Sequence, residues 1–84
     1  MTNAPIDQMK VESKVKVLGR GYVFVVFPTC AIHCGDKVRC NGKDYEVRGV
    51  ERMAFMKHVG LVLSSNEDAG WEINMWDEIE VVHE

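Results

Sequence analysis

The stretch from Ile32 to Glu51, I-H-C-G-D-K-V-R-C-N-G-K-D-Y-E-V-R-G-V-E, holds the strongest fold signal in the chain. Asn41-Gly42 lies between two strand-like runs, and Asn-Gly is the favoured pair for a two-residue type I′ turn, whose central residues both need positive φ. A turn here sets the register of both strands, because a slip by one residue would move every side chain to the other face. The predicted opposite pairs are Cys40–Lys43, Arg39–Asp44, Val38–Tyr45, Lys37–Glu46 and Asp36–Val47.

The two faces of this hairpin differ in character. Its two oppositely charged pairs lie on one face, while Val38 and Tyr45 lie on the other. The second strand changes phase near its end, since Val50 rather than Gly49 continues the apolar set of Tyr45 and Val47. An extra residue at Gly49, a β-bulge, would return Val50 to the core and bend the strand. Bends of this kind close small barrels.

The rest of the chain reads as further short strands separated by turns. No segment of ten or more residues shows sustained helical periodicity, and Ser64 to Gly70 is predicted to be a polar loop. Six short strands indicate an all-β fold, either a sandwich or a small closed six-stranded, antiparallel-rich β-barrel. Closure is favoured, because open apolar edges on so small a chain would aggregate. The strands predicted outside the hairpin are Met9 to Leu18, Tyr22 to Phe27, Met56 to Leu63 and Asp77 to Val82.

Two of these strands carry specific burial predictions. In Met9 to Leu18 the odd-numbered residues, through Val15 and Val17, should face the core, and the lysines should face solvent. Tyr22 to Phe27 is apolar on both faces, so it should be a central strand or have its outer face covered. An exposed apolar stripe there would be a surface for a partner or for self-association. In the last strand Ile79 and Val81 should point inward.

Length and composition indicate one globular domain. The chain has 84 residues, 46% of them hydrophobic and 27% charged, which suits a single barrel over 9–84 after a flexible tail over 1–8. No apolar run is long enough for a membrane helix, and the N-terminal residues do not resemble a signal peptide. Three cysteines cannot all pair within the chain, so reduced thiols and a cytoplasmic location are expected.

Charge is distributed unevenly along the sequence. All ten Lys and Arg lie between Lys10 and Lys57, and six acidic residues occur up to that point in the chain. From His58 onward there are seven acidic residues and no Lys or Arg, so the net charge of the chain is −3. This pattern permits a basic patch on an acidic protein.

Five short motifs, in this order, resemble the second domain of translational GTPases such as elongation factor Tu, which is a six-stranded β-barrel. The resemblance extends from Val15 to Val82 and predicts that fold for a domain standing alone. The motifs are Gly19-Arg20-Gly21 before an apolar strand, Ile32-x-x-Gly35-Asp36-Lys37-Val38, Val47-x-Gly49-Val50-Glu51, Val59-Gly60-Leu61-Val62-Leu63 and Ile73-x-x-x-Asp77-Glu78-Ile79.

The resemblance also implies a site. In tRNA-binding members a pocket for the charged 3′ adenosine lies beside the strands that match Gly49-Val50-Glu51 and Val59 to Leu63, and Glu51 matches by position. A nearby family arginine falls at Ala54, with Arg52 two residues away, so the match is partial. The chain contains no Gly-x-x-x-x-Gly-Lys-Ser/Thr, which argues against GTP binding and GTPase activity.

A faint internal repeat accompanies these motifs. Ile32-x-x-Gly35-Asp36 resembles Ile73-x-x-Trp76-Asp77, and each should be a turn that leads into a strand. Trp76 stands where the family usually has glycine. If this position needs positive φ, the tryptophan is strained.

The cysteines and His33 raise the possibility of a metal site or a thiol-redox protein. Cys30, His33, Cys34 and Cys40 could meet around zinc if the loop before the hairpin folded over the hairpin tip. Their spacing does not follow the usual paired pattern, and the alternative is that they are turn, loop and core thiols. No metal or other cofactor is therefore assigned.

The candidate binding rim consists of charged, apolar and aromatic residues near the predicted barrel ends. Trp71 and Trp76 could stack nucleobases together with Arg20, Arg48 and Arg52, although closure of one barrel end by Trp76 is the favoured interpretation. No acid–base pair or cofactor loop indicates an enzyme. A non-enzymatic binding module for RNA or a translation-related protein is therefore expected, and a protein-interaction or assembly module is the alternative. The rim residues are Arg20, Glu51, Arg52, Leu61, Trp71 and Trp76.

Overall fold

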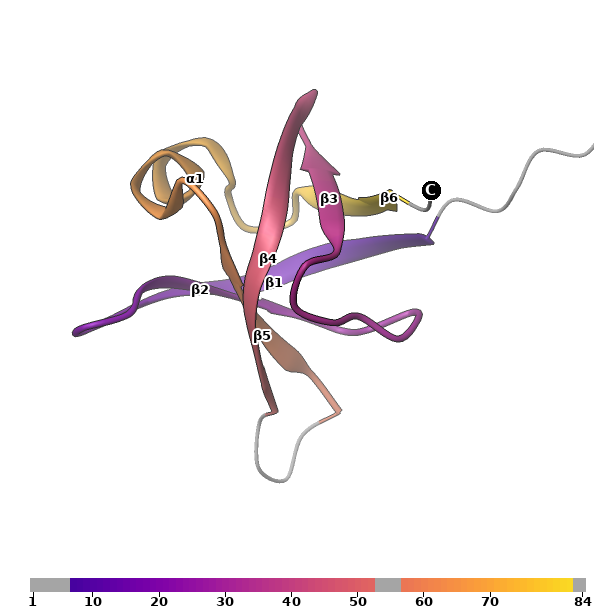
Figure 1. Ribbon diagram of the computed structural model, residues 1–84, viewed down its shortest axis with the longest axis horizontal. Coiled ribbons are helices and arrows are strands. Elements are labelled where there is room, and N and C mark those ends of the chain that lie inside the picture. Colours follow the sequence, from indigo (N-terminus) through magenta and orange to yellow (C-terminus); the bar gives the residue numbers. More distant parts are fainter. Residues whose placement is uncertain (1–6, 53–56, 83–84) are drawn as a thin grey trace, which may run out of the picture.

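The computed structural model describes residues 7–52 and 57–82, which form a closed barrel of six antiparallel strands with one short helix (Figure 1). Around the barrel the strands follow the order β1-β2-β5-β4-β3-β6. The predicted six-stranded barrel is thus confirmed for this part of the chain. The elements are β1 (Asp7–Val17), β2 (Gly21–Val26), β3 (Lys37–Cys40), β4 (Lys43–Arg52), β5 (Val59–Leu63), α1 (Asn66–Glu72) and β6 (Glu78–Val82).

The hairpin of β3 and β4 has the predicted register. Asn41 and Gly42 form its turn with φ of 53° and 79°, as a type I′ turn requires. Val38 and Tyr45 lie opposite one another and are both buried. The predicted pairs Cys40–Lys43, Arg39–Asp44 and Lys37–Glu46 are also present. The predicted pair Asp36–Val47 is not, because β3 begins at Lys37 and Val47 bonds instead to both Gly35 and Asp36 of the preceding turn.

The predicted bulge in β4 is present, and β1 has a second one that was not predicted. The pairing of β4 with β5 shifts between Val47 and Gly49, and the pairing of β1 with β2 shifts between Val11 and Ser13. Because a bulge reverses the alternation of side chains, Val15 is 46% exposed. The prediction that Val15 faces the core is therefore wrong.

Lys14 extends toward α1 on the opposite side of β1 from Val15. Its ammonium group donates to the backbone carbonyl oxygens of Gly70 and Ile73, at 2.7 and 3.1 Å. These carbonyls belong to the end of α1 and the residue that follows it. A lysine that was predicted to face solvent therefore binds the C-terminal end of the helix, where a cation is favourable.

Both faces of β2 are buried. Phe24 and Val26 belong to the core of the barrel, and Val23 and Val25 are only 2% and 9% exposed. The strand lies between β1 and β5. The prediction of a central strand is confirmed, but the predicted apolar stripe on Tyr22 to Phe27 is absent as a surface. Phe27, just after β2, is the exception and is 46% exposed. The core residues include Met9, Val11, Phe24, Val26, Val38, Tyr45, Val47, Leu61, Leu63, Ile73, Ile79 and Val81.

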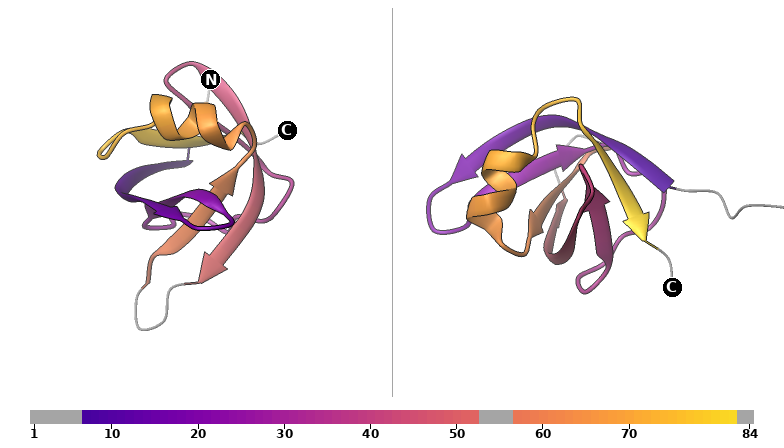
Figure 2. Two further views of the ribbon diagram at one scale, coloured as in Figure 1. Left: turned by 90° about the vertical axis from the view of Figure 1, so that its left-hand side faces the viewer. Right: turned by 90° about the horizontal axis from the view of Figure 1, so that it is seen from above.

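The helix α1 replaces the predicted loop over Ser64 to Gly70, which was wrong. A seven-residue helix is too short for its periodicity to be read reliably. It packs against β2 and β5 at one side of the barrel (Figure 2). The Asn66 side-chain amide attaches it there, accepting the Tyr22 N–H at 2.7 Å and donating to the Tyr22 carbonyl at 2.9 Å. In the described residues no helix has the length and apolar character needed to cross a membrane.

The internal repeat seen in the sequence is a pair of equivalent turns. The turns Ile32–Asp36 and Ile73–Asp77 have positive φ at the same position, 95° at Gly35 and 73° at Trp76. In each turn the aspartate carboxylate accepts the backbone N–H three residues earlier at 2.8 Å. The suspected strain at Trp76 is therefore real.

Each turn is hydrogen-bonded to the bulged strand of one half of the barrel. Gly35 N–H donates to the Val47 carbonyl at 2.8 Å, and Trp76 N–H donates to the Val11 carbonyl at 2.6 Å. Val47 and Val11 also donate their backbone N–H groups to the backbone carbonyl oxygens of Asp36 and Asp77, respectively. Exchanging β1 with β4, β2 with β5 and β3 with β6 reproduces the strand order. The described barrel is thus an internal two-fold repeat of three-stranded halves.

Candidate functional site

A pocket of about 380 Å³ lies on the outer face of β4 and β5. Gly49 and Val62 are opposite one another there, and Glu51 is on the same face of β4. Gly49 presents no side chain, so the backbone of β4 is open to a ligand. The lining residues are Arg20, Cys34, Arg48, Gly49, Val50, Glu51 and Val62.

Strand pairing explains which side chains reach this pocket. Leu61 is opposite Val50 and is fully buried in the core, so its side chain offers nothing to a ligand, contrary to its place in the predicted rim. Side chains alternate along a strand, and the next residue, Val62, faces the pocket instead.

The pocket carries charges of both signs. Arg20, in the β1–β2 turn, forms an ion pair with Glu51 of β4, and both side chains keep contact with solvent. Arg48 Nε lies 3.1 Å from the carboxylate of Glu46. Guanidinium groups can pair with phosphate, and a carboxylate can accept hydrogen bonds from hydroxyl or amino groups. An anionic ligand would have to compete with these ion pairs.

A second pocket, of about 460 Å³, opens at the adjoining end of the barrel. Among the described residues, its lining includes Arg52, Lys57, His33 and His58 and no Asp or Glu. His58 is positioned by a 3.0 Å contact from its Nε2 to Glu12 and by an edge-on contact with Phe27. Val50 lines both pockets, which are therefore neighbours. Ala54, which matches the family arginine, lies outside the described residues.

The four candidate metal ligands lie in different environments. Cys40 is buried in the core, because the hairpin register turns it inward with Val38. Cys30 and His33 line the second pocket, while Cys34 is exposed and its thiol donates to the Arg48 carbonyl at 3.6 Å. Within residues 7–52 and 57–82 no three His, Cys, Asp or Glu side chains are grouped to hold a metal ion.

The two tryptophans lie outside both pockets. Trp71, in α1, is 79% exposed, and Trp76, before β6, is 62% exposed. The expectation that Trp76 closes a barrel end is wrong, because most of its side chain is exposed to solvent. Its backbone, with positive φ, forms the turn that leads into β6. Neither residue joins Arg20, Arg48 or Arg52 around a common cavity.

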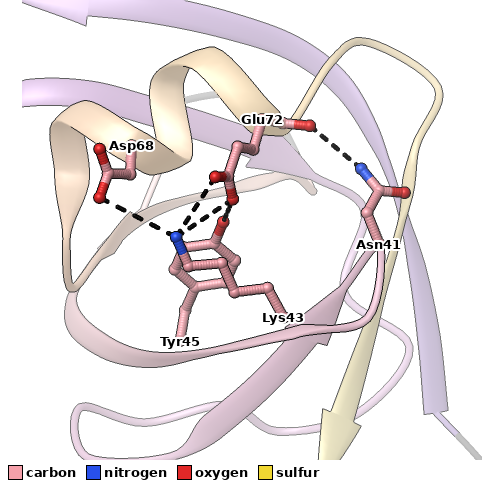
Figure 3. Close-up of polar contacts among 5 residues, drawn as sticks. All are labelled: Asn41, Lys43, Tyr45, Asp68 and Glu72. Atoms are coloured by element: carbon pink, nitrogen blue, oxygen red, sulfur yellow. Dashed lines mark hydrogen bonds and ion pairs between the residues drawn. The ribbon is translucent and has the colours of Figure 1, made fainter.

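A polar cluster holds α1 against the β3–β4 hairpin (Figure 3). The Tyr45 hydroxyl donates to the Glu72 carboxylate at 2.7 Å, and Lys43 Nζ lies 3.2 Å from the same carboxylate. These two hydrogen bonds lower the pKa of Glu72, and burial together with the Glu72 charge raises the pKa of Tyr45. Glu72 also accepts a 3.1 Å bond at its backbone carbonyl from the Asn41 side chain. The cluster fixes the helix that carries Trp71.

In comparisons with known proteins, no family model, curated protein or solved structure matches this chain.

The predicted rim is thus brought together in part. Arg20 and Glu51 meet in one pocket, and Arg52 lines the next. Sequence reasoning missed Val62 as a lining residue and grouped Arg48 with the tryptophans, which lie elsewhere. The alternation around Leu61 and the extra residue at the bulge were the signals that could have placed Val62 and Arg48 in the pocket.

Proposed function

We propose that this chain is a non-enzymatic binding module, a barrel of the elongation factor Tu domain 2 type, that binds an RNA end in the pocket of Gly49, Glu51 and Val62. One observation supports the proposal: a pocket lies beside Gly49-Val50-Glu51 and Val62, the segments that the family resemblance matches to a 3′-adenosine pocket. The order of motifs along the chain and the closed six-stranded barrel agree with that comparison.

The chemistry of the pocket suits a terminal nucleoside. Val62 and Val50 offer an apolar surface to a base or ribose, and the bare backbone at Gly49 permits close approach. The Glu51 carboxylate can accept hydrogen bonds from the hydroxyl groups of a terminal ribose. RNA carries such hydroxyls at the 2′ position, whereas DNA does not.

The neighbouring pocket would hold the phosphates that precede the terminal nucleoside. Arg52 and Lys57 line it, with no acidic side chain among its described lining residues. Neutralised phosphates supply most of the sequence-independent affinity for nucleic acid. The net charge of −3 opposes RNA elsewhere on the surface. Binding should therefore be weak and should decrease steeply with salt.

Fluorescence anisotropy with a 5′-labelled single-stranded RNA at low and high salt tests the proposal. We expect binding at low salt that weakens at high salt. Glu51→Gln and Arg48→Ala should each weaken it about tenfold, the loss expected for about 1.4 kcal/mol. An RNA blocked by a 3′-phosphate should bind less well than one with a 3′-hydroxyl.

Arg39→Ala is the matched control, because Arg39 lies on β3, is exposed and pairs with Asp44. It should leave RNA affinity unchanged. Absence of binding at low salt, or equal loss in Arg39→Ala and Arg48→Ala, would reject the RNA pocket.

A further inference from the structure

Trp76 occupies a backbone conformation that tryptophan disfavours. Its φ is 73°, and in the equivalent turn of the other half of the barrel the same position is Gly35, with φ of 95°. A left-handed conformation is unfavourable for any residue with a Cβ. The 2.6 Å bond from Trp76 N–H to Val11 holds the backbone there, so the strain belongs to the folded state. Strain of this kind accumulates at functional sites.

Burial does not explain why a tryptophan is present. The Trp76 side chain is 62% exposed, Met75 beside it in the sequence is 50% exposed, and Trp71 in α1, five residues earlier, is 79% exposed. Large apolar side chains exposed on a monomer surface can mark interaction sites. A strained residue that contributes little to the core is best explained by what it contacts outside the chain.

The exposed side chains are displayed on a rigid support. The Asn41 side-chain amide donates both to the Glu72 carbonyl, at 3.1 Å, and to the Asp77 carboxylate, at 3.0 Å. One hairpin-tip residue therefore ties together the two ends of the segment between Trp71 and Trp76. A preorganised aromatic surface loses less conformational entropy when it binds.

The charge around this surface selects the partner. No Lys or Arg lies between positions 66 and 80. Lys43 offsets part of the negative charge, since its Nζ lies 3.2 Å from Glu72 and 3.9 Å from Asp68. The acidic residues of this segment are Glu67, Asp68, Glu72, Asp77, Glu78 and Glu80.

We propose that Trp71, Met75 and Trp76 form a docking surface for a partner protein segment that carries Lys or Arg beside apolar side chains. Indole faces attract cations, and the carboxylates of the same segment add long-range attraction. Met75 is unbranched and adapts to irregular apolar shapes. The same carboxylates repel phosphate, which disfavours RNA here. This surface is separate from the RNA pocket and does not depend on it.

Selection from a random peptide library displayed on phage, with the full chain immobilised, tests the partner chemistry. We expect enrichment of peptides in which Lys or Arg alternates with aromatic or aliphatic residues. Synthetic versions should bind at least tenfold more weakly to Trp76→Gly and to Trp71→Ala than to the wild type. Their affinity should also decrease with salt.

Trp76→Gly has a readout that separates docking from folding. Replacing the strained tryptophan with glycine should raise the Tm by about 4–8 °C while peptide binding is lost. Leu18→Ser is the control, because Leu18 is the most exposed apolar residue in the described chain and lies in the β1–β2 turn. It should leave peptide affinity unchanged.

Four outcomes would overturn the proposal. Two concern the selection: peptides are not enriched over the Trp71→Ala/Trp76→Gly double variant, or the enriched peptides are acidic or purely apolar. Two concern affinity: the peptides bind wild type and Trp76→Gly equally well, or Leu18→Ser loses as much peptide affinity as Trp76→Gly. RNA binding that Trp76→Gly abolishes would reassign the surface to nucleic acid. A wild-type dimer in light scattering that becomes a monomer in Trp76→Gly would reassign it to a second copy of the chain.

Discussion

Cys34 and Cys40 belong to the same stretch of chain, yet they lie in opposite environments. Cys40 points into the barrel beside Val38, while Cys34 lies on the rim of the proposed RNA pocket. Burial and the nearby Asp77 carboxylate raise the pKa of the Cys40 thiol to about 11. Because the thiolate is the reactive form, the position of each cysteine determines its chemistry.

Thiol labelling of the native protein should therefore discriminate between the cysteines. We expect a thiol reagent such as a maleimide to modify Cys34 within minutes at pH 7.5 and to modify Cys40 only after unfolding by urea. Peptide mass spectrometry measures the label at each cysteine separately, and in Cys34→Ser the Cys40 thiol should still stay unlabelled until the protein is unfolded. Rapid native labelling at Cys40 would contradict the burial of this side chain.

At the scale of single elements, α1 depends on a close fit with β2. A Cβ added at Gly70 would lie 2.1 Å from Cδ2 of the Tyr22 ring. The helix therefore needs glycine there, even though glycine is a poor helix former. The fit explains how so short a helix is held against the barrel.

Gly70→Ala should destabilise the protein by about 1–3 kcal/mol through overpacking, although alanine by itself favours helices. Urea unfolding measures the change. Glu67→Ala, at an exposed position of the same helix, should remain within about 0.5 kcal/mol of the wild type. In a Tyr22→Ala background the Gly70→Ala penalty should largely disappear. An equal penalty in both backgrounds would reject the Tyr22 contact as its cause.

The clamp between α1 and the β3–β4 hairpin should make stability depend on acid pH. Hydrogen bonds from Tyr45 and Lys43 lower the pKa of Glu72, and bonds from the Asn74 N–H and the Asn41 side chain lower the pKa of Asp77. A carboxyl group with a lowered pKa in the folded state stabilises that state at neutral pH. This contribution is lost as pH falls through the folded pKa.

The free energy of unfolding should accordingly decrease below about pH 5. Urea titrations at several pH values between neutrality and acid measure the slope. Glu72→Gln removes one of the titrating groups, and Tyr45→Phe removes the hydroxyl that contributes most to the Glu72 shift. Both variants should show a shallower decrease. An unchanged slope in both would show that the clamp does not contribute.

At the scale of the whole molecule, closure depends on two bulges in equivalent strands. One bulge follows Val11 in β1 and the other follows Val47 in β4, and each valine is hydrogen-bonded to one of the repeated turns. A bulge bends its strand and increases the local twist, which allows a small sheet to meet its own edge. The two-fold repeat thus places one bend in each half of the barrel.

Deleting Arg48 should prevent cooperative folding, because the pairing of β4 with β5 would slip by one residue and turn Val50 outward. Arg48→Ala keeps the chain length and changes only an exposed side chain, so it should alter stability by no more than about 0.5 kcal/mol. Circular dichroism during thermal unfolding compares the two variants. A cooperative transition in the deletion variant would show that the bulge is dispensable.

Local chemistry carried much of the fold prediction. The type I′ turn at Asn41-Gly42 depends on the φ preferences of two adjacent residues. The β4 bulge could be predicted because Val50 breaks the alternation of apolar residues that Tyr45 and Val47 follow. Both signals lie within a few residues of sequence. The position of Glu51 in a candidate pocket also followed from a short motif.

The amino-acid sequence by itself therefore determined the six strands, the hairpin register and the bulge that precedes Glu51. Only the tertiary structure decided the bulge in β1, the helix α1 and the exposure of Trp76. The reason is physical: these features depend on hydrogen bonds and packing between segments far apart in the chain, such as Asn66 with Tyr22 and Trp76 with Val11. The pattern of apolar and polar residues within one segment does not indicate which distant residues it will contact.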